Sequence, residues 1–178
     1  MQCSSVFLRI LEADDVARTH RWINDPELNE IMGYLPISLR QQQSWFETTI
    51  NNPQKFIFAI CLQQTGEHIG NVALGRIDYL DANAMFSIFI ADQAEHGKGY
   101  GSEATYLALK FGFDRLNLHK IHLKTSDYLS SAIRFYERLG FSREGVLREH
   151  EFKKGRFVDK ILFSMLRSEF VEKYGESD

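Results

Sequence analysis

Residues His96 to Ala104 read His-Gly-Lys-Gly-Tyr-Gly-Ser-Glu-Ala and are the most informative segment of the chain. Its three glycines alternate with other residues, between an expected strand and an expected helix that begins at Ser102. Glycines let backbone N–H groups approach an anion closely, and a helix N-terminus adds roughly half a positive charge. The ligand expected at such a loop is therefore a pyrophosphate.

Two other phosphate-binding loops fit this stretch less well. A Walker A loop needs Gly-Lys followed by Ser or Thr, whereas Lys98 is followed by Gly99. A dinucleotide-binding fingerprint has its third glycine where this sequence has Ser102, and it follows the first strand of a parallel unit. Here four strand-like segments precede the loop. A plain surface loop is the remaining alternative.

The hydrophobic pattern predicts early helices, then an antiparallel meander, then two strand–helix crossovers, which together make a mixed α/β fold. The third helix should begin after Ser38 as N-cap and carry an apolar stripe made by Leu39, Trp45, Phe46 and Ile50. We expect strands at 6–11, 55–62, 68–78, 84–91, 120–125, 141–151 and 157–166, and helices at 12–23, 27–32, 39–50, 102–116 and 130–139.

Composition indicates one globular domain, 1–178, with a core at about 6–167. Of the 178 residues 44% are hydrophobic, enough for a sizeable core, and the sequence shows no linker or repeat. A net charge of -3 without a basic block argues against nucleic-acid binding. No apolar stretch approaches the ~20 residues that span a bilayer, so no membrane partner is expected. Two lone cysteines, Cys3 and Cys61, and no evident secretory signal favour a cytoplasmic location.

The glycine loop resembles that of the GNAT superfamily of N-acetyltransferases. The family pattern, Gln/Arg-x-x-Gly-x-Gly/Ala, corresponds to His96–Gly101. A second family signature, Ala-x-x-x-Tyr-Glu-x-x-Gly-Phe, corresponds to Ala132–Phe141. The segments 8–26 and 144–159 are similar to a subgroup that contains ribosomal-protein-alanine, spermidine and amino-sugar-nucleotide acetyltransferases. The resemblance therefore covers nearly the whole chain.

The resemblance implies a mostly antiparallel, seven-stranded central sheet that splays at an acetyl-CoA site and is flanked by helices. It implies acetyl-CoA as cosubstrate, and the backbone N–H groups of Phe89 and Ile90 as stabilisers of the tetrahedral oxyanion. The six histidines show no paired metal spacing, so no metal is expected. The expected cofactor-binding residues are Phe89, Ile90, His96, Gly97, Lys98, Gly99, Tyr100, Gly101, Ser102, Ala132 and Tyr136.

Making an amide from a thioester and an amine needs a neutral amine, a stabilised oxyanion and a proton for the leaving thiolate. Deprotonating an alkylamine at pH 7 costs about 4 to 5 kcal/mol, judged from the lysine pKa. The resemblance assigns the thiolate's proton to Tyr136 as the catalytic acid, whereas the alternative is a buried helix aromatic that only packs. No sequence pattern suggests an acyl-enzyme, so direct transfer in a ternary complex is expected.

Three positions depart from the family pattern. His96 replaces the usual Gln or Arg, Leu129 stands where an Asn often precedes the tyrosine, and Met85 replaces a Glu on the central strand that serves many relatives as general base. The base is therefore open among several groups on the expected acceptor side. These candidates are Glu30, Asp78, Asp81, Glu149 and His150.

The sequence thus predicts an acetyl-CoA-dependent N-acetyltransferase acting on a primary amine of a small molecule, such as an amino sugar or a polyamine. The alternatives are a protein N-terminal acetyltransferase and a non-catalytic acyl-CoA-binding module. Acidic residues in the first third, Asp25 and Glu27 among them, suggest a cationic acceptor or simply a solvated helix face. Candidate acceptor-binding residues are Glu30, Tyr34 and Glu149, and the chain is expected to be a monomer or a homodimer.

Overall fold

The computed structural model describes residues 1–33, 35–153 and 155–175. Contacts divide the chain into two compact units, one made of residues 1–75 with 88–107 and the other of residues 76–87 with 108–178. Over the described ranges, no helix is both long and apolar enough to cross a membrane. The prediction that the chain is a single domain stays a prediction.

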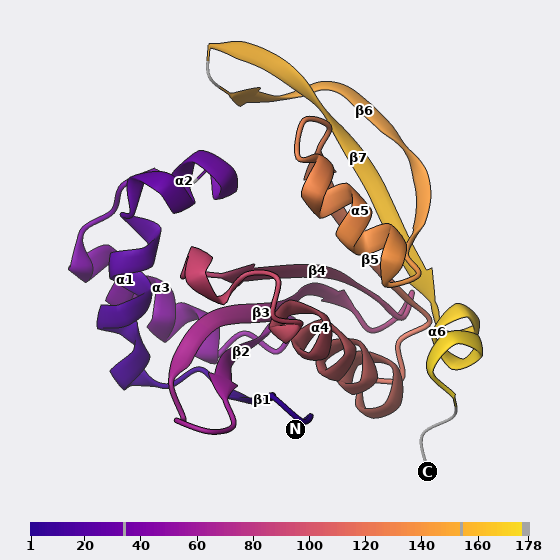
Figure 1. Cartoon of the computed structure of the whole chain (residues 1–178), viewed down its shortest axis with the longest axis horizontal. Helices are drawn as coiled ribbons and strands as arrows, with labels where there is room; N and C mark the ends of the chain where they lie inside the picture. Colours follow the sequence, from indigo (N-terminus) through magenta and orange to yellow (C-terminus); the bar gives the residue numbers. More distant parts are fainter. Residues whose placement is uncertain (34, 154, 176–178) are drawn as a thin grey trace. The chain divides into compact units, whose positions relative to one another are not determined.

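A seven-stranded sheet with the order β1-β2-β3-β4-β5-β7-β6 confirms the mixed α/β class (Figure 1). β1 to β2, β2 to β3, β5 to β7 and β6 to β7 are antiparallel, whereas β4 and β5 are parallel. The register of β4 with β5 covers only the three pairs from Asn83–Lys120 to Met85–His122. The strands are β1 (Val6–Ile10), β2 (Phe56–Leu62), β3 (His68–Asp78), β4 (Asn83–Ile90), β5 (Lys120–Ser126), β6 (Ser142–Lys153) and β7 (Arg156–Leu166).

The helices follow the predicted order with small differences at their ends. Gly33, with a φ of 74°, ends α2 as a left-handed cap, and Ser38 begins α3 with a capping box to Gln41. Two of the helices, the short 3₁₀ helix η2 and the C-terminal helix α6, were not predicted. The helices are η1 (Ala13–Asp15), α1 (Val16–Ile23), α2 (Pro26–Met32), α3 (Leu39–Ile50), η2 (Gln93–Glu95), α4 (Tyr100–Lys110), the π-helical turn η3 (Phe111–Arg115), α5 (Ser130–Arg138) and α6 (Arg167–Tyr174).

The predicted apolar stripe of α3 is wrong in part. Phe46 is buried as expected, but Leu39 and Ile50 are 43% and 55% exposed. Gln42 and Thr49 are buried in their place. The side chain of Gln42 donates a hydrogen bond to the Thr19 hydroxyl of α1 over 3.1 Å. This bond offsets part of the cost of burying the Gln42 amide, whose Oε1 has no hydrogen-bond partner among the described residues, and α3 thus turns a polar position toward α1.

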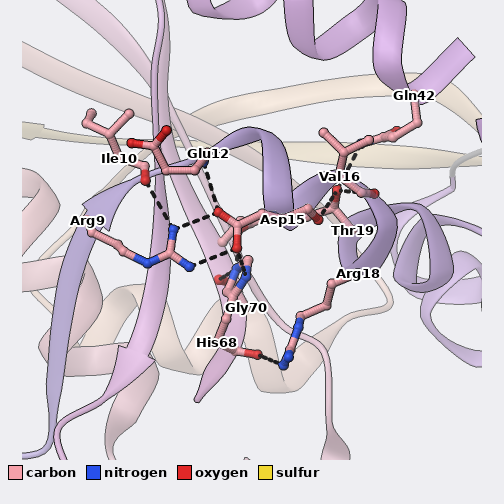
Figure 2. A network of polar contacts seen from close by, with 11 residues as sticks. Arg9, Ile10, Glu12, Asp15, Val16, Arg18, Thr19, Gln42, His68 and Gly70 are labelled. Atoms are coloured by element: carbon pink, nitrogen blue, oxygen red, sulfur yellow. Dashed lines mark hydrogen bonds and ion pairs between the residues drawn. The ribbon is translucent and has the colours of Figure 1, made fainter. Parts of the chain in front are cut away.

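A buried carboxylate joins β1, α1 and β3 in the first unit, where α1, α2 and α3 lie together (Figure 1). Asp15 is 6% exposed and accepts two hydrogen bonds from the Arg9 guanidinium, of 2.6 and 2.8 Å. It also accepts one from the Glu12 backbone N–H, and its Oδ1 lies 3.0 Å from Nδ1 of His68. Figure 2 shows Asp15 between Arg9 and the His68 ring.

The surroundings of Asp15 set its pKa. Burial on its own raises this pKa, but the hydrogen bonds from Arg9 and Glu12, with the charges of His68 and Arg9, lower it to about 2. A carboxylate with a lowered pKa stabilises the fold above its unfolded-state pKa, and this contribution is lost as the pH falls through the folded pKa. Asp15 therefore supports the fold at neutral pH and ceases to do so between about pH 4 and pH 2.

In the second unit, α5 lies beside the long hairpin of β6 and β7 (Figure 1). Its core is aromatic and aliphatic. The buried side chains include Phe86, Phe113, Ile121, Phe141, Phe163 and Met165. The unpredicted helix α6 adds Phe170, 2% exposed, against Phe113 at a centroid distance of 5.1 Å. Most residues of α6 are polar, and Phe170 is its one buried side chain. The sequence therefore shows no apolar periodicity from which this helix could be predicted.

We expect Asp15→Asn to lower the free energy of unfolding at pH 7 by ~2 kcal/mol or more, the equivalent of the lowered pKa. Urea unfolding of both proteins at pH 7 and at pH 3 measures this. The difference should narrow at pH 3, since wild-type Asp15 is by then losing its advantage. A difference that is the same at both pH values would contradict a carboxylate role for Asp15.

Candidate cofactor and acceptor site

The predicted cofactor loop has the backbone geometry that its glycines imply. Gly97 and Gly99 have φ values of 77° and 89°, in the left-handed region that favours glycine. A Cβ added at either position would meet no other atom within 4 Å, so this side of the loop is open. The Gly99 carbonyl accepts from the N–H groups of Ser102 and Glu103 over 3.0 and 3.1 Å. This explains why α4 begins at Tyr100 rather than at the predicted Ser102.

Glu103 anchors the start of α4 to the beginning of β1. Its carboxylate accepts hydrogen bonds from the Ser4 and Ser5 hydroxyls and from the N–H groups of Ser5 and Val6. Burial raises the pKa of Glu103, but these hydrogen bonds outweigh it and lower the pKa overall. The helix N-terminus that would face a pyrophosphate is thus fixed by an ionised side chain in its first turn.

Residues 89–96 bring the end of β4 against the glycine loop. Nε2 of His96 lies 3.0 Å from the Ile90 carbonyl oxygen, and because a carbonyl only accepts, Nε2 carries the hydrogen. Lys98 is paired with Glu95 over 3.0 Å, and this hydrogen bond raises the pKa of Lys98. The departure at His96 therefore has a structural use, since its ring ties the loop to Ile90.

Gly70 of β3 makes the closest approach to the end of β4. A Cβ on Gly70 would lie 2.2 Å from the Phe89 carbonyl oxygen and 2.9 Å from the Ile90 Cα. Only glycine allows the two backbones to come this close. Sequence reasoning missed Gly70, and the available signal was a glycine inside an otherwise hydrophobic strand.

A cavity of about 360 Å³ opens beside Ile90 in the first unit. Three carboxylates contribute to its wall, and one oxygen of each is already engaged. Asp25 caps α2 through the N–H groups of Glu27 and Leu28, Glu27 accepts from the Gln93 amide, and Asp92 caps η2 through the Ala94 N–H. The lining residues are Trp22, Asp25, Glu27, Leu28, Ile90, Ala91, Asp92, Gln93 and His96.

This cavity joins predicted cofactor residues to an acidic surface. Carboxylates gathered at one cavity favour a cationic ligand, because opposite charges attract and each retains acceptor capacity. Of the acidic residues that the sequence suggested, the structure places Asp25 and Glu27 here, whereas Asp92 was not predicted. Asp92 follows the expected strand at once, and only the path of the chain after β4 brings it to α2.

The second unit holds Tyr136 in an aromatic cage. Its ring lies 5.7 Å from Phe141, 6.1 Å from Phe163 and 6.5 Å from Phe86, measured between centroids. Burial in this cage raises the pKa of Tyr136 to about 12. The phenol therefore keeps its proton throughout the physiological pH range.

The other predicted residues have simpler outcomes. Ala132 lies in α5, whose N-cap Leu129 makes no side-chain capping bond, because an aliphatic side chain stands there in place of an Asn. Glu149 lies at a register shift of β6 with a φ of 49°, and its N–H donates to Asp159. Tyr34 lies outside the described residues, and of Glu30 only the backbone, in α2, is described.

The candidate bases and the metal prediction are not decided by these contacts. Asp78 accepts from the N–H groups of Leu80 and Asp81, which gives it a turn-forming role. His150 lies 3.2 Å from the Lys124 amine. In the described part of the chain, no group of three or more His, Cys, Asp or Glu side chains is arranged to hold a metal ion. The absence of a metal stays a prediction.

Comparison with known proteins agrees with this geometry. The model of the acetyltransferase (GNAT) domain matches residues 5–142. An uncharacterized N-acetyltransferase, p20, of Bacillus licheniformis is 30% identical over 92% of this chain and 94% of its own. The spermidine N(1)-acetyltransferase of Escherichia coli (strain K12) is 29% identical over 96% of this chain and 90% of its own.

The fold agrees as well. The crystal structure of spermidine N-acetyltransferase from Vibrio cholerae in complex with CoA and spermine superposes with a TM-score of 0.88. It is 30% identical, and the match covers 93% of this chain and 98% of that one. With the glycine loop, the second signature and the sheet in place, the chain belongs to the GNAT acetyltransferase family.

Proposed function

We propose that this protein transfers the acetyl group of acetyl-CoA to a primary amine of a polyamine, by direct attack in a ternary complex. The acidic cavity beside Ile90 is the observation that carries the choice of acceptor. A polyamine has several ammonium groups, so carboxylates can hold one of them while another reacts. The spermidine acetyltransferases among the relatives support the same choice.

The glycine loop fits the CoA pyrophosphate. Its open side at Gly97 and Gly99 leaves room for an anion, and the first turn of α4 supplies N–H groups and the positive end of the helix dipole. Ser102 and Tyr100 flank these groups in the same turn, and Lys98 adds a cationic side chain. Acetyl-CoA, when bound, supplies the thioester.

The remaining steps fall to the end of β4 and to α5. Backbone N–H groups of Phe89 and Ile90 would stabilise the oxyanion, and Gly70 and His96 hold that backbone in place. Tyr136 would hydrogen-bond to the sulfur of the leaving CoA, with Ala132 one turn earlier in α5. A cytoplasmic location and a monomeric or homodimeric state stay predictions.

A panel of amines tests the function. We expect acetyl-CoA, but not NAD or ATP, to raise the melting temperature, since ligand at a hundred times its Kd adds ~2.7 kcal/mol. Thiol release should then follow addition of spermidine or spermine, and not of an amino sugar or an N-terminal peptide. Glu27→Gln should raise KM for the polyamine roughly 5-fold, the equivalent of ~1 kcal/mol. Glu47→Gln, the same charge change on exposed α3, should leave KM unchanged.

Other results of this panel would replace the proposal. Release with a peptide alone would favour a protein N-terminal acetyltransferase. Binding of acetyl-CoA with no release for any amine would favour a non-catalytic module. No thermal shift with millimolar acetyl-CoA would show that the loop is not a CoA site.

The role of the loop is tested by Gly99→Val. A β-branched side chain at a φ of 89° is strained and would fill the open side, so we expect acetyl-CoA affinity to fall at least tenfold. Calorimetric titration measures the affinity. Gly66→Val is the matched control, because Gly66 has a φ of 71°, equally open surroundings and a place in the β2–β3 turn. Equal affinity in both folded variants would remove the loop from the cofactor site.

The role of Tyr136 is tested by Tyr136→Phe. We expect turnover at pH 7 to fall by ~10²–10⁴, the usual contribution of a positioned acid, with acetyl-CoA affinity within a few fold of wild type. If Tyr136 delivered a proton rather than a hydrogen bond, this deficit in turnover would shrink above about pH 8.5, where a free thiol is already ionised. Tyr174→Phe removes a hydroxyl that donates to the Leu139 carbonyl, so it should cost stability but not turnover. Near-normal turnover of Tyr136→Phe at pH 7 would remove Tyr136 from the reaction.

A further inference from the structure

His68 is a buried polar side chain for which the proposed function has no direct use. It begins β3 and is 4% exposed. Its Nδ1 lies 3.0 Å from the Asp15 carboxylate, and its Nε2 lies 2.9 Å from the Gly70 carbonyl oxygen and 2.8 Å from Oδ1 of Asn71. Arg18 of α1 donates to the His68 carbonyl over 3.0 Å. The ring is thus held at both ends (Figure 2).

The partners fix the direction of these hydrogen bonds. Asp15 is ionised at neutral pH, so Nδ1 donates to it. The Gly70 carbonyl can only accept, so a hydrogen bond to it needs a hydrogen on Nε2 as well, and the ring carries both hydrogens only in its protonated form. Burial lowers the pKa of His68, while the Asn71 hydrogen bond and the Asp15 charge oppose that change. The ring therefore connects the carboxylate that α1 and β1 share to the backbone of Gly70.

Gly70 is the point where β3 approaches the end of β4. The space for its missing Cβ is occupied by the Phe89 carbonyl oxygen, 2.2 Å away. Next to this approach, the Ile69 carbonyl accepts a hydrogen bond from the Ala91 N–H over 2.8 Å. A shift of the Gly70 carbonyl would therefore move Phe89 and Ile90 with it.

A second route from His68 runs through Trp22, a wall of the acidic cavity. The Trp22 ring meets the His68 ring edge to face at a centroid distance of 4.8 Å, and it meets Phe89 in the same way at 5.8 Å. Both contacts lie within the first unit. His68 thus supports the cavity wall and the end of β4 at once.

We propose that His68 is a positioning residue for acetyl transfer, which holds the Gly70 carbonyl and Trp22 so that the Phe89–Ile90 backbone and the acceptor cavity keep their relative placement. The inference rests on the proposed function. His68 touches neither substrate, so it acts on the rate of the chemical step through this placement.

Two amide substitutions of His68 test the roles of its two ring nitrogens one at a time. The amide of His68→Asn can take the place of Nδ1 and keep the bond to Asp15, whereas the longer His68→Gln can reach the place of Nε2 and the Gly70 carbonyl. We expect kcat to fall ~10–100-fold in His68→Asn and less in His68→Gln, with KM for acetyl-CoA within twofold of wild type. A purely structural role predicts instead that kcat follows melting temperature in both variants.

The controls keep stability apart from placement. Phe46→Leu weakens a core cluster of the first unit without touching Trp22 or Gly70, so it should lower the melting temperature and leave kcat unchanged. Gly70→Ala should reproduce the kcat loss of His68→Asn. Gly75→Ala, whose Cβ would lie 3.7 Å from the Lys55 side chain, should not.

Fluorescence gives a readout independent of catalysis. Trp22 and Trp45 are the two tryptophans, so in a Trp45→Phe background the emission reports Trp22 alone. We expect the emission to change in His68→Asn. Unchanged emission, or normal kcat in folded His68→Asn and Gly70→Ala, would overturn the positioning role. If the wild-type protein releases no CoA with any amine, the proposed function fails. The emission of Trp22 would then still show whether His68 holds this residue of the cavity wall in place.

Discussion

The first unit depends on one buried carboxylate, Asp15. A charge in a protein interior is costly unless it is paired and hydrogen-bonded, and Asp15 meets both conditions through Arg9, the Glu12 N–H and His68. Because Arg9 lies in β1 and His68 begins β3, pairing the charge also joins these two strands to the start of α1. The partners of Asp15 lower its pKa to about 2 only when β1, α1 and β3 are arranged as in this structure. Ionisation of Asp15 therefore stabilises this arrangement.

Glycines serve this site in two different ways. Gly97 and Gly99 are needed for a positive φ, and their surroundings are open, as a loop that receives a ligand requires. Gly70 has no positive φ but has no room for a side chain, because the backbone of Phe89 occupies that space. The first kind leaves an open surface at the loop proposed to bind the pyrophosphate, and the second fixes the backbone proposed to stabilise the oxyanion. Only the first kind could be recognised from spacing.

Structural features that depend on residues close together in the sequence could be predicted from it. The glycine loop, the Ser38 cap and the end of α2 at Gly33 follow from local conformational preferences, and the structure confirms each of them. The contacts that the sequence could not predict join distant residues. Gln42 is buried because Thr19 accepts its hydrogen bond, which reversed part of the α3 stripe. The acidic cavity could not be predicted because it brings Asp92 beside α2. The contact between Asp15 and His68 could not be predicted because the two residues are 53 positions apart.

The aromatic cage of Tyr136 bears on how the reaction ends. With a pKa of about 12, the phenol is a weaker acid than a thiol of pKa about 8.5. Complete proton transfer from the phenol to a CoA thiolate would therefore be uphill. A hydrogen bond from the same phenol has no such cost, and it becomes stronger as negative charge develops on sulfur in a site of low dielectric. Tyr136, in the role proposed for it, therefore stabilises the departing thiolate by donating a hydrogen bond, and the thiolate takes its proton from solvent after it leaves.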